Sequence, residues 1–126
     1  MSLRSPLATA RGLGSAKSGT HHWWLQRVTA IALVPLVIWF VISLIVHAGA
    51  SYEEARAWIG SPLPGVILIC LIIAAFHHAQ LGLQVVIEDY IHAEPCKIAA
   101  LLIVKGGAFF VGLLGVFSVA RIAFGG

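Results

Sequence analysis

Two adjacent histidines, His77 and His78, interrupt an apolar run that extends from about Leu63 to Ile87. An imidazole in the hydrocarbon of a membrane loses its hydration, so it persists there only with a polar partner or as a ligand. At about 100° per residue, Gly82 lies about 40° and Asp89 about 20° from the direction of His78 on a helix. An imidazole with a bare backbone patch on the same face is suited to axial ligation of haem iron.

The same pattern also fits a structural role. A histidine inside a membrane often bonds to a neighbouring helix, and a glycine such as Gly82 often serves only to let two helices approach. His77 points about 100° away from His78 and is expected to be structural. The residues alone leave open whether His77 or His78 would bind a metal.

Four further polar residues gather at one predicted membrane boundary. His21 and Arg27 open the first apolar segment, and Asp89 and Tyr90 close the second, about 18 Å along the helix from His78. A haem propionate needs a cation and a quinone carbonyl needs a hydrogen-bond donor such as a phenol. The plain alternatives are that Arg27 is a positive-inside anchor and Tyr90 an interfacial aromatic residue.

The composition requires lipid as the solvent for these residues. The chain has 126 residues, is 60% hydrophobic and only 10% charged, and has a mean hydropathy of +0.96. These values exclude an ordinary soluble globule and a disordered chain. The net charge of +3 and the pI near 9.2 come without a basic cluster, so we expect no nucleic-acid binding.

Three long apolar stretches predict an all-α integral membrane protein with three antiparallel transmembrane helices, at about residues 28–49, 63–87 and 98–120. The connections are short and contain Gly, Pro and charged residues. Pro35 should kink the first helix. We therefore divide the chain into an N-terminal tail, residues 1–26, and a three-helix anchor domain, residues 27–126.

The distribution of basic residues predicts the orientation. One side has Arg4, Arg11, Lys17, Arg27, Lys97 and Lys105, against Arg56 and Arg121 on the other. The N-terminus and the second loop are therefore expected on the cytoplasmic or matrix side. The first 20 residues lack the apolar core of a secretory signal and are interpreted as a retained tail, with a transit peptide as the weaker alternative.

Two segments resemble a known family. The run HAQLGLQVVIEDY, from His78 to Tyr90, resembles the His-Ala-x-x-Gly-x-x-x-Val-x-x-Asp-Tyr signature of the smaller membrane-anchor subunit of succinate dehydrogenase, respiratory complex II. Upstream, GTHHWWLQRVTAI, residues 19–31, is similar to the entry of that family's first helix, where a histidine precedes Arg-x-Thr-Ala by six residues. His22 departs from the pattern, since some relatives have an acid there.

The resemblance implies a set of roles for these residues. His78 would be one axial, metal-bound ligand of haem b, and the other membrane anchor of the complex, a cytochrome b-type subunit, would supply the second histidine. His21 and Arg27 would lie near the haem propionates. Tyr90 would donate a hydrogen bond to a ubiquinone carbonyl, with Asp89 beside it in the quinone site and able to order water there.

The resemblance also implies partners and a location. Succinate would be oxidised in a flavoprotein subunit, and electrons would pass through an iron–sulfur subunit to quinone. The chain has two cysteines and no nucleotide-binding loop, so it has no catalytic residues for succinate chemistry of its own. The expected location is the bacterial inner membrane, with the mitochondrial inner membrane as the less favoured alternative.

Two other functions are consistent with a short hydrophobic chain. A small oligomeric transporter usually depends on a carboxylate inside the membrane. Here all five acidic residues lie in loops or at helix ends: Glu53, Glu54, Glu88, Asp89 and Glu94. The other alternative is a haem-free structural anchor of a fumarate reductase type of complex. The sequence does not determine whether succinate oxidation or fumarate reduction is the physiological direction.

Overall fold

The computed structural model of the protein describes residues 5–10, 12 and 17–125, which form helices and no strand. The helices are α1 (Pro6–Ala10), α2 (Lys17–Val46), α3 (Tyr52–Ile59), α4 (Pro62–Tyr90) and α5 (Glu94–Ala123). Three of them, α2, α4 and α5, are long and apolar enough to cross a membrane. The predicted all-α fold with three transmembrane helices is confirmed.

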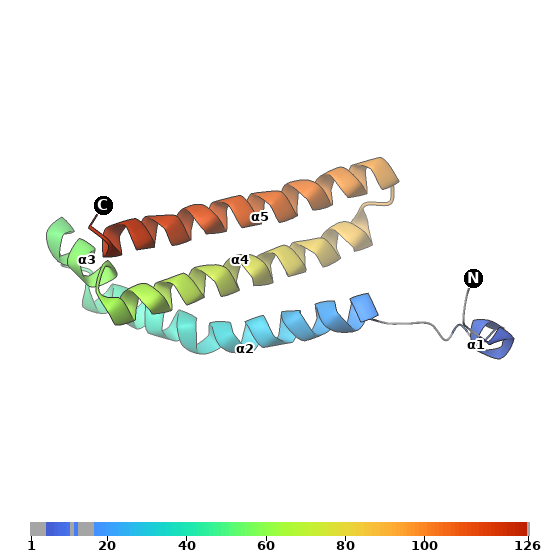
Figure 1. Ribbon diagram of the computed structural model, residues 1–126, viewed down its shortest axis with the longest axis horizontal. Helices are drawn as coiled ribbons and strands as arrows, with labels where there is room; N and C mark the ends of the chain where they lie inside the picture. The colour runs from blue at the N-terminus through green and yellow to red at the C-terminus, as the bar shows by residue number, and fades with distance from the viewer. Residues whose placement is uncertain (1–4, 11, 13–16, 126) are drawn as a thin grey trace.

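The three long helices run side by side in alternating directions (Figure 1). α4 packs against both α2 and α5, whereas the backbones of α2 and α5 do not approach each other in the described part of the chain. The start of α2, the end of α4 and the start of α5 lie at one end of the bundle, and α3 and the C-terminus lie at the other. The predicted antiparallel arrangement is therefore also confirmed.

The helices extend beyond the predicted apolar segments. α2 begins at Lys17 rather than near residue 28 and ends at Val46 rather than near 49, α4 spans Pro62–Tyr90 rather than 63–87, and α5 spans Glu94–Ala123 rather than 98–120. Hydropathy marks the part of a helix that lies in hydrocarbon, whereas backbone hydrogen bonding continues through polar residues at the ends. The predicted tail, residues 1–26, thus overlaps α2; Arg4 and Arg11 lie outside the described residues.

A short helix was not predicted between the first two spans. Ser51 caps α3 through a capping box: its hydroxyl accepts from the Glu54 amide at 3.3 Å, and its own amide donates to the Glu54 carboxylate at 2.7 Å. The hydrogen bond from the Ser51 amide, and after it the Ser51 side chain, lower the pKa of the Glu54 carboxyl below its ordinary value. Trp58 of α3 stacks on Trp39 of α2 at 5.8 Å, which fixes α3 to the bundle.

The interior is thin, and most large apolar side chains face outward. The buried apolar residues of the described chain are Leu68, Leu81, Ile87 and Val119. Glycines bring α4 and α5 together, because a methyl group at Gly112 would lie 3.4 Å from the Phe76 side chain. Pro35 lies inside α2, which bends between its ends (Figure 1). An outer surface of this kind is suited to lipid or to partner transmembrane helices.

Candidate functional site

The contact between α2 and α4 is polar where His78 lies. His78 is half-buried, and its Nδ1 lies 2.9 Å from Oγ1 of Thr29 on α2, which is itself buried. The same hydroxyl lies 2.7 Å from the carbonyl oxygen of Leu25 and 3.2 Å from that of Gln26. Sequence reasoning assigned no role to Thr29, although a hydroxyl in an apolar segment is itself a signal that a polar partner is near.

The hydrogen bonds of Thr29 favour one tautomer of His78. A hydroxyl has one hydrogen, and a carbonyl oxygen can only accept, so the 2.7 Å contact directs the Thr29 hydrogen to Leu25. The hydroxyl oxygen then accepts from Nδ1–H of His78. In the neutral ring Nε2 consequently keeps its lone pair, which is the form in which an imidazole binds a metal.

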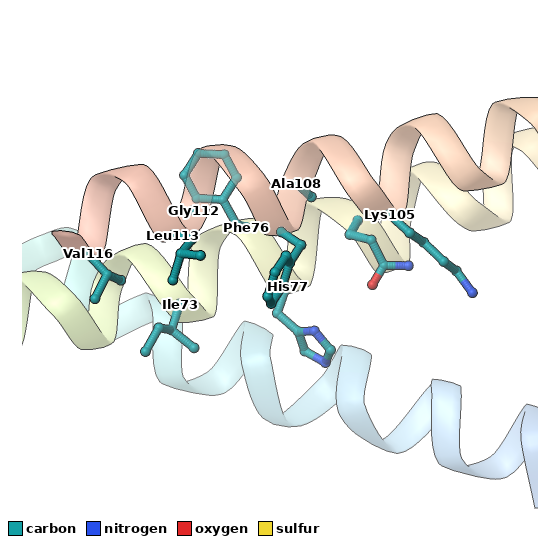
Figure 2. Close-up of a pocket in the computed structure, with 10 residues that line it drawn as sticks. Ile73, Phe76, His77, Lys105, Ala108, Gly112, Leu113 and Val116 are labelled. Carbon is teal, nitrogen blue, oxygen red and sulfur yellow. The ribbon is translucent and has the colours of Figure 1, made fainter. Parts of the chain in front are cut away.

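His77 lies in a different environment from His78. It lines a groove of about 460 Å³ between residues 73–80 of α4 and 105–116 of α5, hereafter the α4–α5 groove (Figure 2). His77 makes no hydrogen bond within the described residues. The two adjacent imidazoles therefore have different neighbours, and only that of His78 is hydrogen-bonded across the α2–α4 contact.

Gly82 does not present an entirely open patch. A methyl group at position 82 would lie 3.8 Å from the amide nitrogen of Gln26, so α2 covers part of the predicted bare surface. Two buried polar atoms on the same side of α2, Nε2 of His22 and Oε1 of Gln26, have no hydrogen-bond partner among the described residues. His22, Gln26 and Thr29 follow one another at helical spacing, so the α2–α4 contact is polar from His78 to the end of the bundle.

His21 and Arg27, both expected near haem propionates, lie within α2. Both are exposed, rather than preceding and opening that helix. The Arg27 guanidinium lies over the ring of Trp23, 5.5 Å from its centroid, in a cation–π contact. His21 makes no hydrogen bond with any other described residue.

Asp89 and Tyr90 end α4 at the same end of the bundle as the start of α2. Both are exposed, Tyr90 to 78%, and neither makes a side-chain hydrogen bond within the described residues. A phenol and a carboxylate in this position are open to an external partner. The structure does not bring them into contact with His21 or Arg27.

No three side chains of the kinds that bind metals cluster among the described residues. A haem held between two chains would need only one ligand from each, and Nε2 of His78 is a nitrogen of the required type. The residues present therefore fit a haem shared with another subunit, and the ligand role of His78 stays a prediction.

Comparison with known proteins identifies the family. Residues 1–115 match the family described as succinate dehydrogenase/fumarate reductase transmembrane subunit. The chain is 36% identical over 102 residues to the succinate dehydrogenase hydrophobic membrane anchor subunit of Rickettsia bellii (strain RML369-C), which covers 81% of this chain and 82% of the relative. The subunit of the same name from Paracoccus denitrificans is 34% identical over 121 residues, 96% of this chain and 93% of its own length. No solved structure matches the chain.

Proposed function

The chain belongs to the family of succinate dehydrogenase and fumarate reductase transmembrane subunits, and on this premise we propose that it is the hydrophobic membrane anchor of a succinate:ubiquinone oxidoreductase. The three apolar helices and the relatives from Rickettsia and Paracoccus indicate a bacterial membrane protein. In this function it anchors the flavoprotein and iron–sulfur subunits at the inner membrane, beside the second anchor subunit, and contributes to a haem b site and a ubiquinone site.

The hydrogen bond between Thr29 and His78 is the observation that carries the haem assignment. It holds the ring of His78 against α2, and Nε2 is then the nitrogen that would bind iron. Haem, when bound, supplies a one-electron carrier within the membrane. The second histidine ligand would come from the partner anchor subunit.

At the end of the bundle, exposed cationic and hydrogen-bonding groups complete the two sites. Arg27 and His21 would pair with haem propionates. For this, Arg27 either moves away from the Trp23 ring or donates from the guanidinium N–H groups that point past the ring. Tyr90 donates a hydrogen bond to a quinone carbonyl, and Asp89 holds the water that delivers protons there. The exposure of both residues supports a site completed by other subunits.

The experiment is a reduced-minus-oxidised spectrum of the complex purified with its natural partners. We expect a b-type haem signal that is lost or shifted in His78→Ala and retained in His77→Ala, a control that removes the adjacent imidazole. An unchanged spectrum in His78→Ala, with all subunits still present, contradicts the haem assignment. A wild-type complex without haem would instead support the haem-free anchor.

The quinone site is tested separately. Tyr90→Phe removes only the phenolic hydroxyl, so we expect a lower rate of quinone reduction by succinate while reduction of a soluble acceptor by the flavoprotein is unchanged. Tyr52→Phe is the matched control, since Tyr52 is similarly exposed but lies in α3 at the opposite end. Full quinone reductase activity and inhibitor sensitivity in Tyr90→Phe would limit this residue to an interfacial role.

A further inference from the structure

Lys105 is a cation inside a membrane-spanning helix without a counter-ion. It is exposed, and no acidic side chain pairs with it anywhere in the described part of the chain. The 30 residues of α5 are about 45 Å long, against a hydrocarbon thickness of about 30 Å. Lys105 is about 16 Å along that helix from Glu94, so its Cα lies below the boundary of the hydrocarbon. A cation at this depth needs an anion or water.

Lys105 lies at one end of the α4–α5 groove, and the lining of the groove is partly polar and partly apolar. Its polar lining residues are His77, Gln80 and Lys105, and the remaining lining residues are apolar. In Figure 2, Lys105 extends toward the end of the bundle where α4 meets α5, whereas Ile73 and Val116 lie at the opposite end of the groove. The groove therefore runs along the helices, with its cation toward the predicted cytoplasmic surface.

A chain of polar side chains connects this end of the groove to the membrane surface. The Gln80 amide donates to Gln84 Oε1 at 3.2 Å, and the Gln84 amide donates to the Glu88 carboxylate at 2.9 Å. These residues follow one another at i, i+4 and i+8 on α4. They give a polar headgroup near Lys105 a hydrogen-bonding surface that continues to the end of the helix.

We propose that the α4–α5 groove binds one anionic phospholipid of the cytoplasmic leaflet. The lipid phosphate pairs with the Lys105 ammonium, whose flexible stem brings it toward the headgroups, and an acyl chain lies along Ile73, Leu113 and Val116. A neutral quinone would fill the apolar part but leave the ammonium without an anion. Polar and apolar parts of the groove lie in the same order as those of a lipid in that leaflet.

The test is the number of lipids retained by the intact complex, measured by native mass spectrometry after incubation with phosphatidylglycerol or phosphatidylcholine vesicles. We expect preferential retention of phosphatidylglycerol, and a loss of at least about fivefold in its affinity in Lys105→Met, the factor that about 1 kcal/mol per basic residue corresponds to. Lys105→Arg should retain the binding. Leu113→Trp, which fills the apolar part without changing the charge, should weaken it.

Lys97→Met is the matched control, because Lys97 is on the same helix but outside the groove and pairs with Glu94 at 3.2 Å. This variant should bind phosphatidylglycerol as the wild type does. Equal binding of the two lipids, unchanged binding in Lys105→Met, or a cross-link between Lys105 and a carboxylate of another protein in the complex would each overturn the proposal. None of these readouts depends on haem or quinone.

Discussion

Replacing Thr29 with valine is the sharpest perturbation that the site allows. Valine has nearly the shape of threonine and the same branching at Cβ, so α2 and its packing should persist. The change removes one oxygen, which lies 2.9 Å from Nδ1 of His78 and 2.7 Å from the Leu25 carbonyl. The Leu25 carbonyl keeps its position within the helix, so the effect should be concentrated on His78.

The magnitude follows from the group that is left without a partner. A buried donor that loses its acceptor destabilises the site by about 1–3 kcal/mol, and half-burial of His78 places the value in the lower part of that range. Loss of a residue that supports a metal ligand typically lowers metal affinity by about 10–100-fold, or about 1.4–2.7 kcal/mol. The two estimates agree, and we expect haem affinity to fall by about tenfold.

Haem content per complex and the haem midpoint potential are the measurements. Loss of the acceptor makes the imidazole a weaker donor to ferric iron, so the potential should rise, by about 59 mV if ferric binding weakens tenfold relative to ferrous. Thr29→Ser keeps the oxygen and should restore both values. Ser118→Ala is the control, since it removes a hydroxyl that is also bonded to a helix carbonyl, at 2.8 Å, but is exposed and makes no hydrogen bond to a histidine of the described chain.

Two results would refute the reasoning in different ways. Unchanged haem content and potential in Thr29→Val, with haem lost in His78→Ala, would show that the hydroxyl does not support the ligand. Unchanged haem in both variants would refute the ligand itself. Equal losses in Thr29→Val and Ser118→Ala would mean that any missing hydroxyl disturbs the bundle.

Other predictions concern the fold. Gly112→Leu should overpack against Phe76 and reduce the stability of the folded protein by about 1–3 kcal/mol, seen as a lower thermal midpoint of the complex. Gly107→Leu should leave the midpoint unchanged, since nothing lies within 4 Å of that position. Equal midpoints for the two variants would contradict the packing. Ser51→Ala should weaken α3 by about 1 kcal/mol, seen as faster hydrogen exchange of its amides. Because the pKa of Glu54 is lowered in the folded protein, this residue stabilises α3 fully above its ordinary pKa, and the stabilisation is lost as the pH falls through the lowered value. Protection of α3 corrected for intrinsic exchange should fall there, and Glu54→Gln should abolish that pH dependence.

The sequence was a good guide to the spans and a poorer guide to their ends. Long runs without charge favour membrane helices because the helix satisfies its own backbone in lipid, so the number and order of the three spanning helices followed directly. α3 was missed because its eight residues are not hydrophobic as a whole, although Ser51 and Glu54 carry the spacing of a capping box. The predicted start of α2 was too late because hydropathy detects only apolar residues, and the helical residues before Trp23 are mostly polar.

The candidate site depended more on tertiary structure. Sequence alone determined that His78 lies deep in a membrane helix, because composition and helical rise fix its depth, and the motif from His78 to Tyr90 identified the family. The different surroundings of His77 and His78 became visible only with the position of α2 around α4, since adjacent residues on a helix differ only in direction. Thr29 is 49 residues away in the chain and meets His78 only because the two helices pack antiparallel. The need of Lys105 for a counter-ion follows from its depth along α5, whereas the groove beside it exists only because α4 and α5 pack together.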